Sequence, residues 1–196
     1  SEVTIVCDKF SNPEWIASDL IGQAEHDNLA QCILISKDKS IIKKVNDEIV
    51  NQLKELPRAA IAKNSLLNNG ILIHMRSNQK IINTVNKIAP EHLELNIKNY
   101  KNTVGKIKNS GSICLGKYAV MAMTDYGVPG SNHVLPTNTS SRYSSGLSVG
   151  EFTKKISYIN LSKKGIYSLA PSVITLANYE GLVGHARSVE KRIRRK

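Results

Sequence analysis

Glu91 and His92 are adjacent titratable residues in the stretch Ile88–Leu95, which reads I-A-P-E-H-L-E-L. A carboxylate beside an imidazole is a natural pair for proton transfer, because histidine ordinarily titrates near neutral pH. The sequence therefore indicates an acid–base pair. The alternative is a surface acid next to a hydrogen-bonded loop histidine. The octapeptide alone favours that alternative, because short motifs are weakly specific.

Pro90 marks the junction of two predicted elements. Apolar residues at helical spacing precede it, and proline disfavours helical backbone in the residue before it, so we expect a helix to stop here with Ala89 extended. Beyond it, Leu93 and Leu95 alternate with Glu94, which predicts a strand with one buried face. The acid–base pair is thus expected at a helix-to-strand junction, where a rigid scaffold can hold catalytic side chains.

Four further residues have side chains that could bind a metal ion: Gln23, His26, Asp125 and His185. Gln23 and His26 are three residues apart on a predicted helix and therefore share a face. Asp125 and His185 are remote in the sequence, and no spacing rule brings the four together. For each histidine taken alone a structural or surface role is favoured, because one histidine is not a site.

Strand and helix patterns alternate along the first part of the chain. The predicted strands are Glu2–Cys7, Cys32–Ile35, Ile71–His74, Leu93–Asn96 and Ser112–Leu115. The predicted helices begin at Pro13, near Asp38, at Pro57, after Ser77 and at Asn99. This alternation is typical of an α/β fold with a largely parallel sheet.

The composition changes after Gly116. Residues Gly127–Gly150 are rich in Gly, Pro, Ser, Thr and Asn, and their tight proline–glycine clusters favour an ordered, functional loop. Leu161–Arg195 is predicted to be mostly helix, kinked at Pro171, and it carries Glu180 and His185. We therefore expect an α/β domain over residues 1–145 and a small, mainly helical region over residues 146–196.

The composition indicates a soluble globular chain. It has 196 residues, 41% of them hydrophobic and 22% charged, and no apolar run approaches the ~20 residues needed to cross a bilayer. Cys7, Cys32 and Cys114 are odd in number and widely spaced, which indicates reduced core residues of a cytoplasmic protein. The chain enters a strand pattern at once without an initiator methionine, which suggests that it is cut from a longer one.

The net charge of +11 raises the possibility of a polyanionic partner. Only Lys191–Lys196 forms a dense basic run, and no aromatic residue is interleaved with it. A basic nucleic-acid-binding module is therefore a weaker alternative, and solvated helix faces explain most of the lysines.

Five segments, read together, resemble the histidinol dehydrogenase family in its own order. They are G-Q-A-E-H-D at Gly22–Asp27, A-P-E-H-L-E-L at Ala89–Leu95, S-N-H-V-L-P-T at Ser131–Thr137, S-S-G-L-S-V at Ser144–Val149 and Y-E-G-L-V-G-H-A-R at Tyr179–Arg187. The resemblance covers essentially the whole chain. It implies a zinc-containing, NAD-dependent enzyme that oxidises L-histidinol through its aldehyde to L-histidine.

The resemblance also implies roles for individual residues. Glu91 and His92 match the family's acid–base pair, with His92 taking the alcohol proton and Glu91 activating the water that attacks the aldehyde. The residues that match the zinc ligands are Gln23, His26, Asp125 and His185. Those that match substrate contacts are the same four together with Ser1, His92 and Glu180. Family members are homodimers with a shared active site, so His185 is expected to come from the partner subunit.

The chain departs from the family pattern in two respects. The loop from Asp125 to His133 is slightly longer than usual. More importantly, the chain matches only the C-terminal part of the family's length, and the preceding part carries most of the NAD contacts. The Rossmann-like sheet is therefore expected to be incomplete, and an inactive zinc-holding fragment is the alternative to an active dehydrogenase.

Overall fold

A parallel β-sheet organises the first part of the molecule. The computed structural model describes residues 1–128, 130 and 132–194. Within them the sheet has five strands in the order β3-β2-β1-β4-β5. The strands are β1 (Glu2–Cys7), β2 (Gln31–Ser36), β3 (Gly70–His74), β4 (His92–Asn96) and β5 (Ser112–Leu115). Every adjacent pair is parallel, so the predicted α/β class with a parallel sheet is confirmed.

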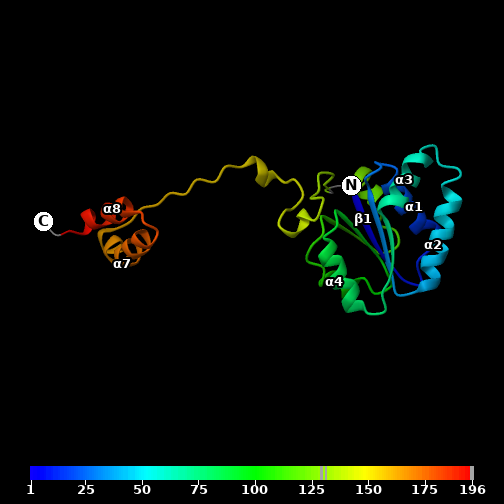
Figure 1. Ribbon diagram of the computed structural model, residues 1–196, viewed down its shortest axis with the longest axis horizontal. Helices are drawn as coiled ribbons and strands as arrows, with labels where there is room; N and C mark the ends of the chain where they lie inside the picture. The colour runs from blue at the N-terminus through cyan, green and yellow to red at the C-terminus, as the bar shows by residue number, and fades with distance from the viewer. Residues whose placement is uncertain (129, 131, 195–196) are drawn as a thin grey trace. The chain divides into compact units, whose positions relative to one another are not determined.

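Helices cover both faces of this sheet (Figure 1). They are α1 (Pro13–Ala24), α2 (Lys39–Gln52), α3 (Ala59–Asn69), α4 (Asn78–Ile88), α5 (Lys101–Val104) and α6 (Met121–Tyr126). Helices α1, α2 and α3 share one core cluster with alternate residues of β1, among them Val3 and Ile5. Helix α4 packs on the opposite face, where Leu93 and Leu95 of β4 contribute to a second cluster. The sheet is therefore buried between two helical layers, as expected for parallel strands.

Side-chain caps explain where several helices begin. Asn12, Asp38 and Ser77 each accept a hydrogen bond from a backbone N–H in the first turn of α1, α2 and α4 respectively. Pro13 occupies the first position of α1, where its missing N–H costs nothing. The predicted starts of these three helices are confirmed.

The junction around Pro90 differs from the prediction in two ways. Ala89 is left-handed, with φ 53° and ψ 57°, and it caps α4 by donating to the Val85 carbonyl. The prediction of an extended conformation for Ala89 was wrong, because a helix can also end in a residue with left-handed backbone. Strand β4 is buried on both faces, and Glu94 is 1% exposed. The apolar alternation was misleading here because helices cover both faces of the sheet.

The chain divides into two compact units, Ser1–Glu151 and Phe152–Lys196. The 3-10 helix η1 (Ser140–Arg142) precedes this division, and a second one, η2 (Val149–Phe152), extends across it. Pro129 and Ser131 in the longer loop, and Arg195 and Lys196 in the basic run, lie outside the described residues.

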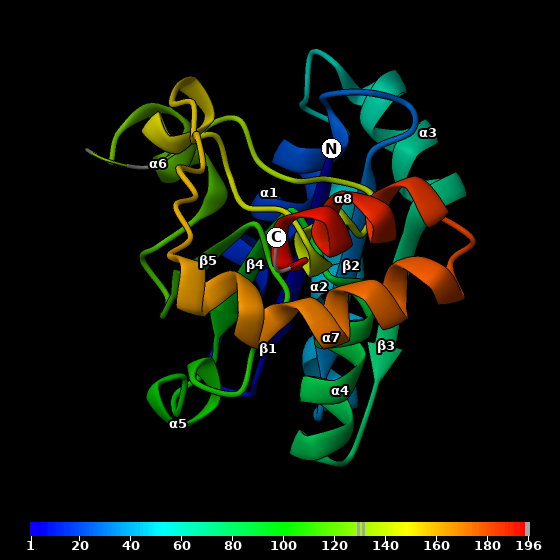
Figure 2. The ribbon, with the colours of Figure 1, turned by 90° about the vertical axis from the view of Figure 1, so that its left-hand side faces the viewer.

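The second unit contains the helices α7 (Lys163–Tyr179) and α8 (Val183–Ile193), which pack against each other (Figure 2). The prediction of a mainly helical C-terminal region is confirmed. Pro171 lies inside α7, and a kink there stays a prediction. The helical segment is interrupted between α7 and α8, where Gly181 has φ 75°. Within the described residues, no helix is long and apolar enough to cross a membrane.

Candidate functional site

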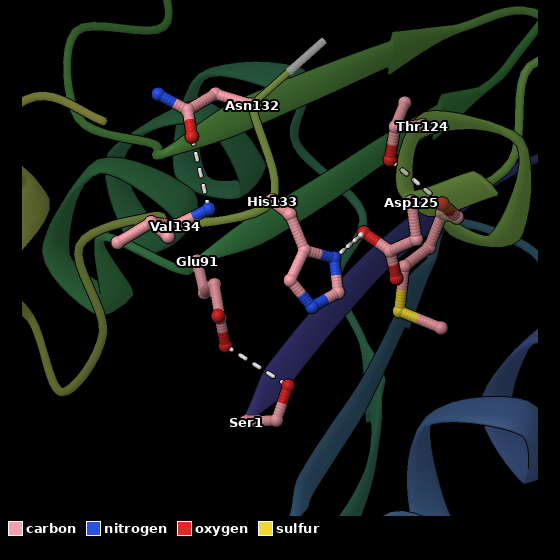
Figure 3. A network of polar contacts seen from close by, with 8 residues as sticks. Ser1, Glu91, Thr124, Asp125, Asn132, His133 and Val134 are labelled. Atoms are coloured by element: carbon pink, nitrogen blue, oxygen red, sulfur yellow. Dashed lines mark hydrogen bonds and ion pairs between the residues drawn. The ribbon is translucent and has the colours of Figure 1, made fainter. Parts of the chain in front are cut away.

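Glu91 lies immediately before β4 and is tied to the start of β1. Its Oε2 accepts a hydrogen bond from Ser1 Oγ at 3.1 Å (Figure 3). The same oxygen accepts from the Glu2 backbone N–H at 2.8 Å. The residue is only 7% exposed. Two donors on one oxygen fix the orientation of this carboxylate, and they bring Ser1, a predicted substrate contact, beside a predicted catalytic residue.

The backbone of Glu91 is held from the other side by the turn into β5. The Gly111 N–H donates to the Pro90 carbonyl at 2.9 Å, and the Ser112 N–H donates to the Glu91 carbonyl at 2.8 Å. A Cβ atom at position 111 would lie 2.6 Å from the Glu91 carbonyl oxygen. Glycine is therefore required at this close approach of two backbones.

His92 is the first residue of β4 and is 4% exposed. Its Nδ1 is buried without a hydrogen-bond partner. Burial lowers the pKa of this imidazole below its ordinary 6.5, and the nearby carboxylates of Glu91 and Asp125 oppose that effect. His133 and His26 also lie close enough to lower the pKa. The structure thus gathers residues from four separate segments of the first unit around a histidine that is neutral at pH 7.

Gln23 and His26 occupy the C-terminal end of α1. The Gln23 side chain is fully buried, yet its Oε1 and Nε2 both lack a hydrogen-bond partner. His26, just past the helix end, is exposed. An unpaired buried amide costs free energy unless something binds to it, so Gln23 is poised for a ligand.

Asp125 lies on α6 and contacts a histidine that was not among the predicted site residues. His133 Nδ1 is 3.4 Å from Asp125 Oδ1, and the Asp125 side chain is 6% exposed against 66% for His133 (Figure 3). The motif S-N-H-V-L-P-T contains His133, and this was the available signal. The contact between His133 and Asp125 was missed because the sequence gives no reason to place that loop beside α6. The helix α6 was itself not predicted.

The chemistry of these groups fits a metal such as zinc. No group of three or more His, Cys, Asp and Glu side chains among the described residues is close enough to hold a metal ion as they stand. The unpaired Gln23 amide, the shielded Asp125 carboxylate and the His26 imidazole nevertheless offer oxygen and nitrogen ligands of the kind zinc accepts. Each belongs to the first unit.

Glu180 and His185 belong to the second unit. Glu180 is the C-terminal cap of α7 and His185 lies in the first turn of α8. Both residues are exposed.

The candidate site lies at the amino ends of β1 and β4. In doubly wound sheets, ligands usually bind beyond the carboxyl ends of the strands. A cavity of about 430 Å³ does lie at the carboxyl ends, and Cys7, Asp38 and Asn99 help to line it. The predicted site residues of the first unit are at the opposite edge of the sheet.

The fold and the site define an α/β protein with a buried Glu–His pair and nearby side chains of the kind that bind metals. A sequence profile of the histidinol dehydrogenase family matches residues 1–193. The chain therefore belongs to the histidinol dehydrogenase family.

Known proteins support this assignment. The chain is 88% identical over 196 residues to a histidinol dehydrogenase of Pelagibacter ubique, covering 100% of this chain and 46% of that protein. It is 44% identical to one from Nitrosomonas europaea, covering 98% and 44% of the two chains. The crystal structure of histidinol dehydrogenase from Elizabethkingia anophelis superposes with a TM-score of 0.83 at 40% identity, covering 98% and 44%. The chain thus spans less than half the length of these relatives.

Proposed function

We propose that this chain supplies the substrate-oxidising part of an NAD-dependent histidinol dehydrogenase, which converts L-histidinol to L-histidine through L-histidinaldehyde. The observation that carries the proposal is the convergence on His92 of Glu91, Asp125 and His26. Family membership favours this interpretation over a nucleic-acid-binding module.

His92 is the general base in this proposal. Its imidazole is neutral at pH 7 because burial lowers its pKa, so it can accept the proton of the substrate hydroxyl as the carbon is oxidised. Burial also excludes water from the imidazole, which keeps the proton transfer directed to the substrate. The same imidazole serves again in the second oxidation.

Glu91 acts only in the second oxidation. Its carboxylate is oriented by Ser1 and by the backbone of Glu2, and it can take a proton from the water that attacks the aldehyde. The first oxidation needs no water, so the carboxylate contributes little to it. The two residues therefore divide the work of the two steps.

The proposal includes the two groups that the family uses. Gln23, His26 and Asp125 would hold zinc, with His185 and the substrate contact Glu180 contributed by the partner subunit of a homodimer. Bound zinc would supply a template that orients the imidazole and amine of histidinol, and NAD would supply the hydride acceptor, one molecule for each of the two oxidations. Three buried free thiols are consistent with a reducing compartment, so we propose a cytoplasmic location.

The chain as given is expected to have little or no dehydrogenase activity by itself. It spans less than half the length of its relatives, and hydride transfer needs a positioned nicotinamide. A zinc-holding fragment without turnover is the second candidate function.

The test joins this chain to the preceding part of the Pelagibacter ubique relative, which is a suitable donor at 88% identity. Formation of NADH on addition of L-histidinol is expected from the joined protein and not from the 196-residue chain alone. The matched control is His92→Gln in the same protein, which should reduce the rate by about 10²–10⁴-fold. A joined protein that binds L-histidinol but forms no NADH would contradict the proposed function.

A further inference from the structure

A buried polar bridge lies behind the candidate site and uses none of its residues. Its members are Asp19 of α1, Glu94 of β4 and the backbone N–H of Met121, the first residue of α6. These three elements also carry the candidate residues Gln23, His92 and Asp125. The bridge therefore connects the scaffolding of the site.

We propose that Asp19 and Glu94 are a positioning pair, which fixes α1, β4 and α6 relative to one another beneath the candidate site. This inference rests on the proposed function, because a positioning role presupposes a functional site. The contacts described below do not depend on that function.

The link between β4 and α6 is a direct hydrogen bond. Glu94 Oε1 accepts from the Met121 N–H at 2.8 Å, and both residues are buried, at 1% and 5% exposure. Glu94 is paired in register with Ile5, whose side chain belongs to the core cluster beneath α1. The carboxyl group therefore points into the helical layer that contains α1.

The link between β4 and α1 is a carboxyl–carboxyl contact. Asp19 Oδ2 and Glu94 Oε2 are buried, and neither has a hydrogen-bond partner among the described residues. The two carboxyl groups nevertheless lie close enough to interact with each other. Two adjacent carboxyl groups hydrogen-bond when they share a proton, and burial raises the pKa of Glu94 to about 8 and that of Asp19 to about 6. One proton held between them joins the two elements.

Each member of the bridge lies one structural repeat from a candidate residue. Asp19 precedes Gln23 by about one helical turn, so the two side chains share a face of α1. Glu94 follows His92 by one strand repeat, so both side chains are on the same side of β4. The first residue of α6 likewise precedes Asp125 by about one turn.

A second contact joins α1 to the segment before α6. The rings of Trp15 and Tyr118 have centroids 6.0 Å apart, and Trp15 precedes Asp19 by about one turn on the same helix face. The helices α1 and α6 are also in contact. The bridge is thus part of an interface between these two helices.

The energetics of buried acids favour a positioning role. Taking carboxyl groups out of water is costly, and buried ionisable groups can often be replaced by apolar residues without loss of stability. A hydrogen-bonded network, by contrast, has directional bonds that select one arrangement of its elements. Asp19 and Glu94 therefore contribute more to the geometry of the site than to the stability of the fold.

Three variants separate these contributions, measured in the chain joined to the preceding part of the Pelagibacter ubique relative. Glu94→Leu removes the acceptor for the α6 N–H, and Glu94→Gln keeps an acceptor oxygen and adds a donor toward Asp19. The matched control is Val45→Ala, which opens a cavity in the core beneath α2 and removes no member of the bridge. Should Glu94→Leu not fold, Asp19→Ala at a half-buried helix position gives the equivalent reading.

The first readout is the affinity for Co²⁺, followed by its visible absorption as a substitute for zinc. Glu94→Leu should weaken Co²⁺ binding by about tenfold, the lower end of the effect of removing an outer-shell partner. Glu94→Gln should restore most of the affinity. Val45→Ala should lower the unfolding midpoint without changing Co²⁺ binding. Unchanged affinity in Glu94→Leu, or the same loss in Val45→Ala, would overturn the positioning role.

The second readout is amide hydrogen exchange in Met121–Tyr126, which needs neither metal nor substrate. Exchange should be faster in Glu94→Leu and close to wild type in Glu94→Gln. If wild-type protein bound no Co²⁺, the metal part of the proposed function would fail while this exchange still tested the bridge. Equal protection of α6 in Glu94→Leu and wild type would show that the bridge does not hold the helix.

Discussion

Glu91 Oε2 lies 3.1 Å from Ser1 Oγ, so the carboxylate that precedes β4 is tied to the residue that precedes β1. The two strands are neighbours in the sheet, and their pairing begins at Val3 and His92. The sheet itself therefore sets the distance between the acid, the histidine and Ser1. Mutations that disturb this edge of the sheet should affect the site before they affect the rest of the fold.

Gly111→Ala should disturb that edge directly. The new Cβ would meet the Glu91 carbonyl oxygen at 2.6 Å, so the backbone must shift, at a cost of about 1–3 kcal/mol in the free energy of unfolding. Gly22→Ala in α1 is the matched control, because a Cβ there meets no atom within 4 Å and should stabilise the helix by about 0.5–1 kcal/mol. Urea denaturation measures both. Equal effects of the two changes would contradict the close approach at Gly111.

Stability should fall as the pH rises through the range in which Glu94 titrates. Burial raises the pKa of Glu94 from 4.5 to about 8. It also raises the pKa of Asp19, which faces Glu94 from α1, from 3.8 to about 6. The folded state therefore holds more protons than the unfolded state. The contribution of Glu94 is complete below pH 4.5 and is lost as the pH rises through about 8, and that of Asp19 is complete below pH 3.8 and is lost as the pH rises through about 6. The slope for one proton is at most about 1.4 kcal/mol per pH unit.

Glu94→Gln should flatten this dependence, because it removes one titrating group and the negative charge that faces Asp19. Cys114, which faces Glu94 from β5, stays neutral throughout, since burial raises the pKa of its thiol to about 12. The control is Glu55→Gln at an exposed position, which should keep the wild-type slope. Free energies of unfolding at several values between pH 5 and 8 test this. A slope unchanged in Glu94→Gln would rule out the shared proton.

Zinc content should depend on His26. His26→Ala removes one imidazole ligand, so elemental analysis of the joined protein should find substoichiometric zinc after dialysis, whereas wild type retains it. His74→Ala is the matched control, because this histidine lies at the carboxyl end of β3 and its Nε2–H donates to the Lys37 carbonyl. Unchanged zinc in His26→Ala would remove this residue from the proposed ligands.

The three cysteines should be inert in the native protein. Cys7, Cys32 and Cys114 are free and buried, and burial raises the pKa of each to about 12. Iodoacetamide at pH 8 should leave all of them unmodified until the protein is denatured, because the thiolate is the reactive form. Mass spectrometry counts the modified thiols. Rapid modification of the native chain would show that these positions are accessible.

The sequence predicted the order and type of the main elements because their signals are local. Caps at Asp38 and Ser77, and the proline at Pro13, act within one helical turn of the residue that carries them. The left-handed Ala89 and the two buried faces of β4 depend on packing that a single strand pattern does not encode. The interruption of the C-terminal helical segment at Gly181 likewise reflects a backbone conformation that few residues adopt easily.

The candidate site was only partly accessible from sequence. Glu91 and His92 could be recognised as candidates because they are adjacent in the sequence. Gln23 and His26 could be paired because their spacing places them on one face of a helix. The positions of Asp125 and His133 depend on α6 and on the loop that follows it. Neither segment has a strong hydrophobic periodicity in the sequence. The bridge of Asp19 and Glu94 was hidden because an acid in an amphipathic pattern is normally expected to face solvent. The roles of the predicted site residues remain predictions.

The division of labour between His92 and Glu91 is tested most directly by single-turnover measurements in the joined protein. One experiment begins from L-histidinol and the other from L-histidinaldehyde, with NADH formation followed in each. His92→Gln should slow both oxidations by about 10²–10⁴-fold, and Glu91→Gln should slow only the oxidation of the aldehyde by a similar factor. If Glu91→Gln slowed both oxidations equally, or if His92→Gln left either one unchanged, the proposed acid–base roles would be wrong.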